Sequence, residues 1–281
     1  MNEYGRGKEG LQMGVNVFIE GIQGMGKSTL QQAIFAEMPE LHICREGDYS
    51  PVELAWCTWM TGEEYQRILQ QFDSLSKEVV GHTVREGDHY IVSYTRILTD
   101  VPQFHKELER FEIYNGRKSL RELEQIILAR YERFVGTGYL FECAFLQNIV
   151  EELILFQQLS DDEIVAFYDR LYAAVYKEDF LLFYLYSDKI EECTRTIQKE
   201  RSDAQGNQLW YDLMLKYLIH SPYGIRQGCQ GFEDLVNHFR HRQRVELRII
   251  NEVVREQAVI LPAKEWKIEE VLERIRAYKC R

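Results

Sequence analysis

The stretch that decides the fold is residues 15–28, which read VNVFIEGIQGMGKS. Its first part, VNVFIE, is rich in β-branched and aromatic residues and predicts a buried strand that ends at Gly21. After a glycine-rich turn, apolar residues recur at helical spacing from Lys27 to Met38. A strand, a glycine-rich turn and a helix in this order are typical of an α/β protein that binds its ligand where the strand ends.

The turn from Gly21 to Ser28 matches the phosphate-binding pattern G-x-x-x-x-G-K-[ST]. Its glycines let backbone N–H groups approach a phosphate, which also faces the positive end of the following helix. Lys27 is expected to reach the β- and γ-phosphates, and Ser28 to bind Mg²⁺ through its hydroxyl. The guanine-reading sequence N-K-x-D is absent from the chain, which favours ATP over GTP. The expected nucleotide-binding residues are Gly21, Gln23, Gly24, Met25, Gly26, Lys27, Ser28 and Thr29.

Four more apolar runs predict strands. They are residues 41–45 (LHICR), 138–142 (GYLFE), 180–186 (FLLFYLY) and 258–261 (AVIL). Continuous apolar runs separated by long helical stretches indicate strands that are covered on both faces. The sequence therefore predicts an α/β fold with a five-stranded parallel sheet flanked by helices.

The chain is expected to form one domain over residues 14–281, after a flexible leader of residues 1–13. A helical insertion is predicted at about residues 62–137, between the second and third strands of the sheet. Within it, residues 89–95 (HYIVSYT) predict an inserted strand. A segment at about residues 188–207, which contains Arg195, Lys199 and Arg201, follows the fourth strand.

Capping patterns predict where several helices begin. Ser50-Pro51-Val52-Glu53 combines a cap residue, an N-terminal proline and a glutamate, so a helix is expected to start at Pro51. Three further patterns are Ser119-x-x-Glu122, Ser160-x-x-Glu163 and Asp188-x-x-Glu191.

The composition excludes several classes of protein. Among 281 residues, 34 Lys and Arg stand against 45 Asp and Glu, and the net charge of −11 gives no positive field for nucleic acid. The longest apolar run, residues 180–186, is far shorter than the roughly 20 residues of a membrane span. The first residues lack the apolar stretch of a signal peptide, and the six cysteines form no C-x-x-C pair. A cytoplasmic protein with reduced thiols is expected, without nucleic-acid or membrane partners, and the charge is compatible with a homodimer.

Carboxylates follow two of the predicted strands, Glu46 after the second and Glu142 at the end of the third. Together with the phosphate-binding pattern, a basic helix after the fourth strand and a short last strand, they make the chain resemble the P-loop nucleoside and nucleotide kinases, the thymidylate kinase and deoxynucleoside kinase group. The resemblance implies a P-loop NTPase fold and transfer of a phosphoryl group from Mg-ATP. Two features depart from the group: Cys143 stands where an arginine often follows the carboxylate, and the insertion is long.

Phosphoryl transfer needs a carboxylate near the acceptor or Mg²⁺ and cations near the transferred group. Either Glu46 or Glu142 is expected to orient the acceptor hydroxyl as the base, and Glu142 is also a candidate for the metal site together with Ser28. The segment that corresponds to the lid of the resembling kinases supplies the candidate cations Arg195, Lys199 and Arg201. The alternative for each cation is a solvated helix paired with local glutamates.

Candidate acceptor-binding residues lie between the second strand and the inserted strand. They are Asp48, Tyr49, Trp56, Arg85 and Arg96. The aromatic residues among them could enclose a ring, and the arginines could hold an anion; the alternatives are packing in the core and capping of a turn. His238 and His241 lack partners at metal-ligand spacing and are expected to be packing or surface residues.

The leading hypothesis is thus a Mg-ATP-dependent kinase that acts on a small-molecule hydroxyl or phosphate acceptor. The alternative is an ATP-hydrolysing or ATP-sensing switch that binds a protein partner through the insertion. A nucleotide-bound scaffold without turnover is a third hypothesis.

Overall fold

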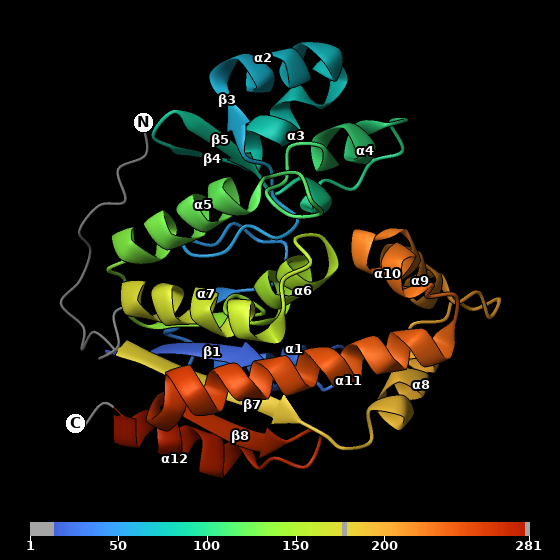
Figure 1. Ribbon diagram of the computed structural model, residues 1–281. Coiled ribbons are helices and arrows are strands. Elements are labelled where there is room, and N and C mark those ends of the chain that lie inside the picture. Colours follow the sequence, from blue (N-terminus) through green and yellow to red (C-terminus); the bar gives the residue numbers. More distant parts are fainter. Residues whose placement is uncertain (1–13, 176–178, 279–281) are drawn as a thin grey trace.

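A five-stranded parallel sheet forms the centre of the computed structural model, which describes residues 14–175 and 179–278 (Figure 1). The predicted strands are confirmed, and the predicted leader, 1–13, lies outside the described residues. Across the sheet the strands are β2 (His42–Cys44), β6 (Tyr139–Glu142), β1 (Asn16–Glu20), β7 (Phe180–Tyr186) and β8 (Ala258–Pro262). Every residue of β1 is buried, as the apolar run requires.

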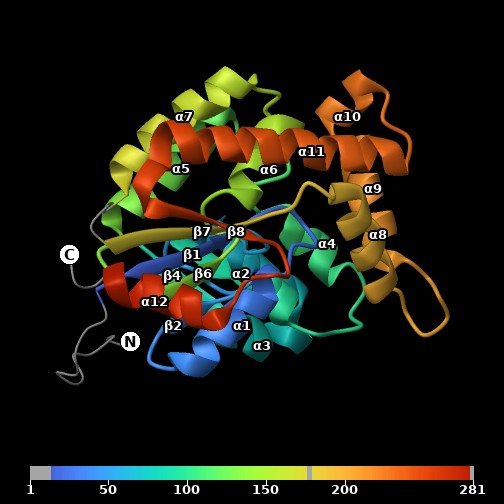
Figure 2. The ribbon, with the colours of Figure 1, turned by 90° about the horizontal axis from the view of Figure 1, so that it is seen from below.

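Helices cover both faces of this sheet (Figures 1 and 2). One face carries α1 (Lys27–Glu37) and α12 (Ile268–Tyr278), which contact each other. The other face carries α5 (Leu120–Arg133), α6 (Gln147–Leu155), α7 (Asp161–Ala174) and α11 (Phe232–Ile249). After α11 the chain forms a π-helical turn, Ile250–Val254, and a 3₁₀ turn, Arg255–Gln257. None of the helices in the described ranges has the length and apolar character needed to cross a bilayer.

The insertion is only partly helical, which corrects the prediction for residues 62–137. Its helices are α2 (Gly62–Gln71), α3 (Ser76–Gly81), α4 (Phe104–Glu109), the 3₁₀ turns Asp73–Leu75 and Tyr94–Arg96, and α5, which packs on the central sheet. The inserted strand is confirmed as β5 (His89–Val92), and it lies between β3 (Met60–Thr61) and β4 (Thr83–Glu86) in an antiparallel sheet. These two partners were missed because β3 is two residues long and β4 lacks an apolar run. The insertion has a hydrophobic cluster of its own, including Tyr65 and Phe104.

The capping predictions had mixed outcomes. Ser119 and Ser160 form the predicted capping boxes at the starts of α5 and α7. Helix α8 (Ile190–Glu200) also exists, but Lys189 precedes it and no side chain caps it, so the cap at Asp188 was wrong. It leads to α9 (Leu209–His220) and α10 (Pro222–Gln227).

The helix predicted at Pro51 is absent, since residues 51–59 form turns and extended chain. Ser50 Oγ does accept the backbone N–H of Glu53 at 3.2 Å, as in a capping box. The Glu53 carboxylate, however, turns into the interior and accepts the N–H of Ala55 at 2.7 Å instead of returning to Ser50. At Trp56 the backbone adopts a left-handed conformation, with φ 63°, which a helix cannot continue through.

Candidate active site

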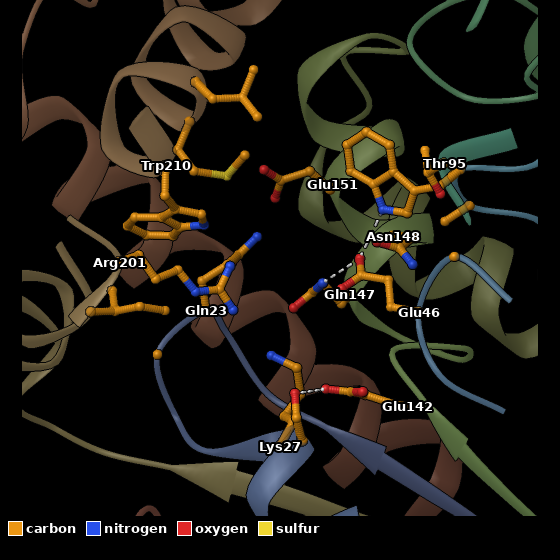
Figure 3. A pocket seen from close by; sticks show the side chains of 18 of the residues that line it. Gln23, Lys27, Glu46, Thr95, Glu142, Gln147, Asn148, Glu151, Arg201 and Trp210 are labelled. Atoms are coloured by element: carbon orange, nitrogen blue, oxygen red, sulfur yellow. Dashed lines mark hydrogen bonds between the residues drawn. The ribbon is translucent and has the colours of Figure 1, made fainter. Parts of the chain in front are cut away.

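A cavity of about 930 Å³ opens where β1, β2 and β6 end. Parallel pairing brings these ends together, because Ile19 of β1 lies opposite Glu142 of β6. The lining comes from the glycine loop (residues 21–28), the segments after β2 and β6, the insertion, helices α6, α8 and α9, and the segment after β8. In Figure 3, Lys27 lies at the base of the cavity, with Arg201 and Trp210 on one side and Glu46 and Thr95 on the other.

The glycine loop has a conformation that needs glycine. A Cβ at Gly21 would lie 2.6 Å from the carbonyl oxygen of Leu185, so the loop packs directly on the backbone near the end of β7. Gly26 has φ 90° and ψ 25°, and it precedes α1 without a side-chain cap. The first N–H groups of α1 are therefore left for another acceptor, and Lys27, Ser28 and Thr29 line the cavity there. Such a helix start attracts anions.

Lys27, Ser28 and Glu142 form the base of the cavity. The Lys27 ammonium donates to the carbonyl oxygens of Gly21 at 2.8 Å and Ile22 at 3.0 Å, and its side chain is buried. Ser28 Oγ donates to Glu142 Oε1 at 2.5 Å. Burial raises the pKa of Glu142, while the Ser28 hydroxyl and the Lys27 charge oppose that rise. Two side-chain oxygens that could bind a metal ion, from Ser28 and Glu142, and the Lys27 ammonium therefore lie together beside the loop, where the sequence predicted them.

Not every predicted loop residue reaches the cavity. Gln23, Gly24 and Gly26 line it with the three residues that follow. Met25 does not line the cavity, because its side chain is fully buried in the hydrophobic core. Gly21 is not among the lining residues and instead offers its carbonyl oxygen to Lys27.

Glu46 lies across the cavity from Arg201 and Trp210 (Figure 3). Its Oε1 accepts hydrogen bonds from Trp56 Nε1 and from Gln147 Nε2, each at 3.2 Å. Trp56 and Arg96 line the cavity as predicted. Arg96 is already occupied, because its Nη2 donates to the Glu46 carbonyl oxygen at 2.9 Å and its Nε pairs with Asp48 at 2.8 Å.

The other predicted acceptor residues do not line the cavity. Asp48 holds Arg96 from outside it. Tyr49 donates to Glu86 at 2.7 Å, and Arg85 donates to the carbonyl oxygen of Gly87 at 2.9 Å while lying over the ring of Tyr90. These residues stabilise the insertion, and the packing alternatives apply to them.

Of the predicted lid cations, the structure brings only Arg201 into the cavity, where its guanidinium lies 5.6 Å from the ring centre of Trp210. Arg195 pairs with Glu191 at 3.0 Å and lies over Phe232, and Lys199 is exposed on the same side of α8. The reason is helical geometry: the face of α8 that contains Ile197 is buried, and Arg195 and Lys199 lie on another face. Arg195 and Lys199 were therefore wrong as cavity residues.

The sequence reasoning missed several residues around the cavity. Glu20 is fully buried, and it accepts the N–H groups of Phe145 at 2.6 Å and Gln147 at 3.0 Å. Burial raises its pKa to about 7. The signal was available, since Glu20 ends an apolar strand as Glu142 does. Gln147, Glu151 and Trp210 had no comparable signal, because only the fold brings them to the cavity.

The two histidines of α11, buried His238 and half-buried His241, each contact a carboxylate. His238 contacts Glu151 at 3.1 Å, and His241 contacts Asp161 at 2.7 Å. Within the described ranges no three His, Cys, Asp or Glu residues gather as a metal site would need. Comparison of the chain with protein-family models and with curated proteins finds no match.

Proposed function

We propose that this protein transfers a phosphoryl group from Mg-ATP to a small-molecule acceptor, as the nucleoside and nucleotide kinases that it resembles do. The observation that carries the proposal is the continuity of one cavity. The same space runs from the glycine loop and Lys27 to Glu46 and the insertion. It is at the upper end of the roughly 300–1,000 Å³ usual for ligand sites, so a donor and an acceptor can share it.

The residues at the base fit a magnesium-bound triphosphate. The uncapped start of α1 and the buried Lys27 ammonium offer N–H donors for phosphate oxygens. Ser28 and Glu142 offer hard oxygen ligands only 2.5 Å apart, and Mg²⁺ prefers such ligands. When bound, Mg-ATP supplies the phosphoryl group and a cation that neutralises its charge. Lys264 and Trp266, from the segment after β8, line the same end and are available to the nucleotide base.

The remaining roles follow from position. Glu46 is held by Trp56 and Gln147 through Oε1, and its Oε2 is free of hydrogen bonds from the described residues. Glu46 is therefore the better placed of the two candidate bases, because Glu142 is occupied by Ser28. Arg201 is the lid cation that lines the cavity, and it is assigned to the transferred phosphoryl group.

The test is ADP formation from Mg-ATP, with and without a mixture of hydroxyl-bearing acceptors. We expect ADP to form only with an acceptor and to be lost in Lys27→Ala. The matched control is Lys199→Ala, which removes an exposed lysine outside the cavity and should retain activity. Equal turnover without acceptor would contradict the kinase and support the ATP-hydrolysing switch, whereas equal activity in Lys27→Ala would refute the assignment of the loop.

A further inference from the structure

The end of the cavity that would hold the phosphoryl acceptor, here called the acceptor end, is rich in carboxylates and has no unused cation among the described residues. Phosphoryl transfer to a hydroxyl does not by itself require this distribution of charge. This end is formed by the segment after β2, the insertion and the start of α6. Each nitrogen-bearing side chain there already donates to the protein. Trp56 and Gln147 donate to Glu46, Asn148 donates to the Cys143 carbonyl oxygen at 3.0 Å, and Asn115 donates to Glu112 at 2.6 Å. Arg96 is occupied by Asp48 and the Glu46 backbone.

Three carboxylates, Glu46, Glu112 and Glu151, line the same end. Both oxygens of Glu112 already accept hydrogen bonds within the protein, from Tyr94 and Asn115. Gln147 Oε1 lacks a hydrogen-bond partner among the described residues, but this atom is enclosed by protein and is not open to a bound molecule. The carboxylate that is both fixed by buried partners and open on one oxygen is Glu151.

Glu151 lies one helical turn after Gln147 and also lines the cavity. Its Oε2 receives Arg242 Nη1 at 2.7 Å and His238 at 3.1 Å, and both of these partners are buried. Burial alone would raise the pKa of Glu151, but His238 and Arg242 outweigh it and lower the pKa to about 2. The described residues donate no hydrogen bond to Oε1. Buried ion pairs are weak stabilisers, so the network is better explained by the ionised carboxylate that it holds at the cavity wall.

We propose that the acceptor is an alcohol that carries an amino group and no phosphate, and that Glu151 binds this amino group. An acceptor phosphate would meet Glu46, Glu112 and Glu151, and the described residues offer it no unpaired cation at this end. An amino group instead supplies the donor that Glu151 Oε1 lacks. That the alcohol hydroxyl reacts rests on the proposed function. That the cavity binds the amino group does not.

The experiment measures binding by calorimetry, with Mg²⁺ and a non-hydrolysable ATP analogue present, and ADP formation in parallel. Two matched sets are used: cytidine, uridine and cytidine 5′-monophosphate, then glucosamine, glucose and glucosamine 6-phosphate. Within at least one set we expect the amino compound to bind about tenfold to a hundredfold more tightly than its counterpart without the amine. The phosphate compound should bind at least about tenfold more weakly than the amino compound. The set that responds distinguishes an aromatic amine from an ammonium group.

Glu151→Gln should abolish the preference for the amine. Because this change also leaves Arg242 with one carboxylate fewer, the matched control is Glu246→Gln, which removes the other carboxylate of Arg242 but does not line the cavity. The control should keep the preference. Equal binding of amine and non-amine, tighter binding of the phosphate compounds, or no binding by either amino compound would each overturn the inference. If the amine preference is found but no acceptor yields ADP, the inference stands and the proposed kinase activity fails.

Discussion

Replacing Gly26 with alanine tests whether the glycine loop binds phosphate. An L-residue at φ 90° pays about 1–2 kcal/mol of backbone strain. A Cβ at this position meets no close neighbour, the nearest atom being Lys264 Cγ at 3.9 Å, so packing adds no cost. The free energy of unfolding should therefore fall by about 1–2 kcal/mol, which lowers the melting temperature by a few degrees.

The effect on nucleotide binding should be much larger, because the added methyl group would project into the space where the phosphates are expected. The wild type should gain about 2.7 kcal/mol of stability at a Mg-ADP concentration of 100 times Kd. Gly26→Ala should gain almost none. The assay is thermal unfolding with and without Mg-ADP, followed by circular dichroism.

Gly87→Ala is the matched control. Gly87 also has a positive φ, 57°, and a Cβ added there would meet no atom within 4 Å, but Gly87 lies in the turn between β4 and β5 and outside the cavity. This variant should lose similar intrinsic stability and keep the full response to Mg-ADP. An unchanged Mg-ADP response in Gly26→Ala would refute the reasoning, as would an equal loss of response in both variants.

Three further predictions concern residues at the cavity. Glu142→Gln should lower ADP formation by at least about tenfold and weaken its dependence on Mg²⁺, as a Mg²⁺ titration would show, because Ser28 would lose its carboxylate partner. Arg201→Ala should reduce kcat by at least about tenfold, whereas Arg195→Ala should leave it unchanged, and steady-state kinetics of the pair would decide between them. Burial raises the pKa of Glu20 from its ordinary value of 4.5 to about 7, so the folded protein keeps a proton that the unfolded chain loses as pH rises. Stability should therefore fall between about pH 4.5 and 7 by on the order of 3 kcal/mol from this group, and urea unfolding at pH 5 and pH 8 should show a smaller fall in Glu20→Gln.

The sequence predicted the central sheet well because its inner strands, β6, β1 and β7, are largely buried on both faces. A continuous apolar run such as residues 180–186 carries that information locally. The insertion was predicted less well, since β3 and β4 are short strands that depend on pairing with β5. The helix expected at Pro51 failed for a related reason. Burial of the Glu53 side chain is a tertiary event, and it removed one half of the capping box.

The base of the site was predictable because its residues follow a sequence pattern and the ends of strands. Lys27, Ser28 and Glu142 needed only the parallel register of β1 and β6 to meet. The lid could not be predicted at the level of single residues. Arg195 and Arg201 are both basic residues near one helix, and only the packing of α8 through Ile197 decides which of them faces the cavity.

Helix α6 connects the two ends of the cavity. Its start is fixed by Glu20, the last residue before the glycine loop, which accepts the N–H groups of Phe145 and Gln147. The first turn of α6 then holds Glu46 through Gln147, and the next turn places Glu151 at the acceptor end. Because these residues are spaced along one rigid helix, the distance between the phosphate end and the acceptor end is set by the anchor at Glu20. Loss of that anchor should therefore impair transfer between two bound ligands more than it impairs the binding of either one.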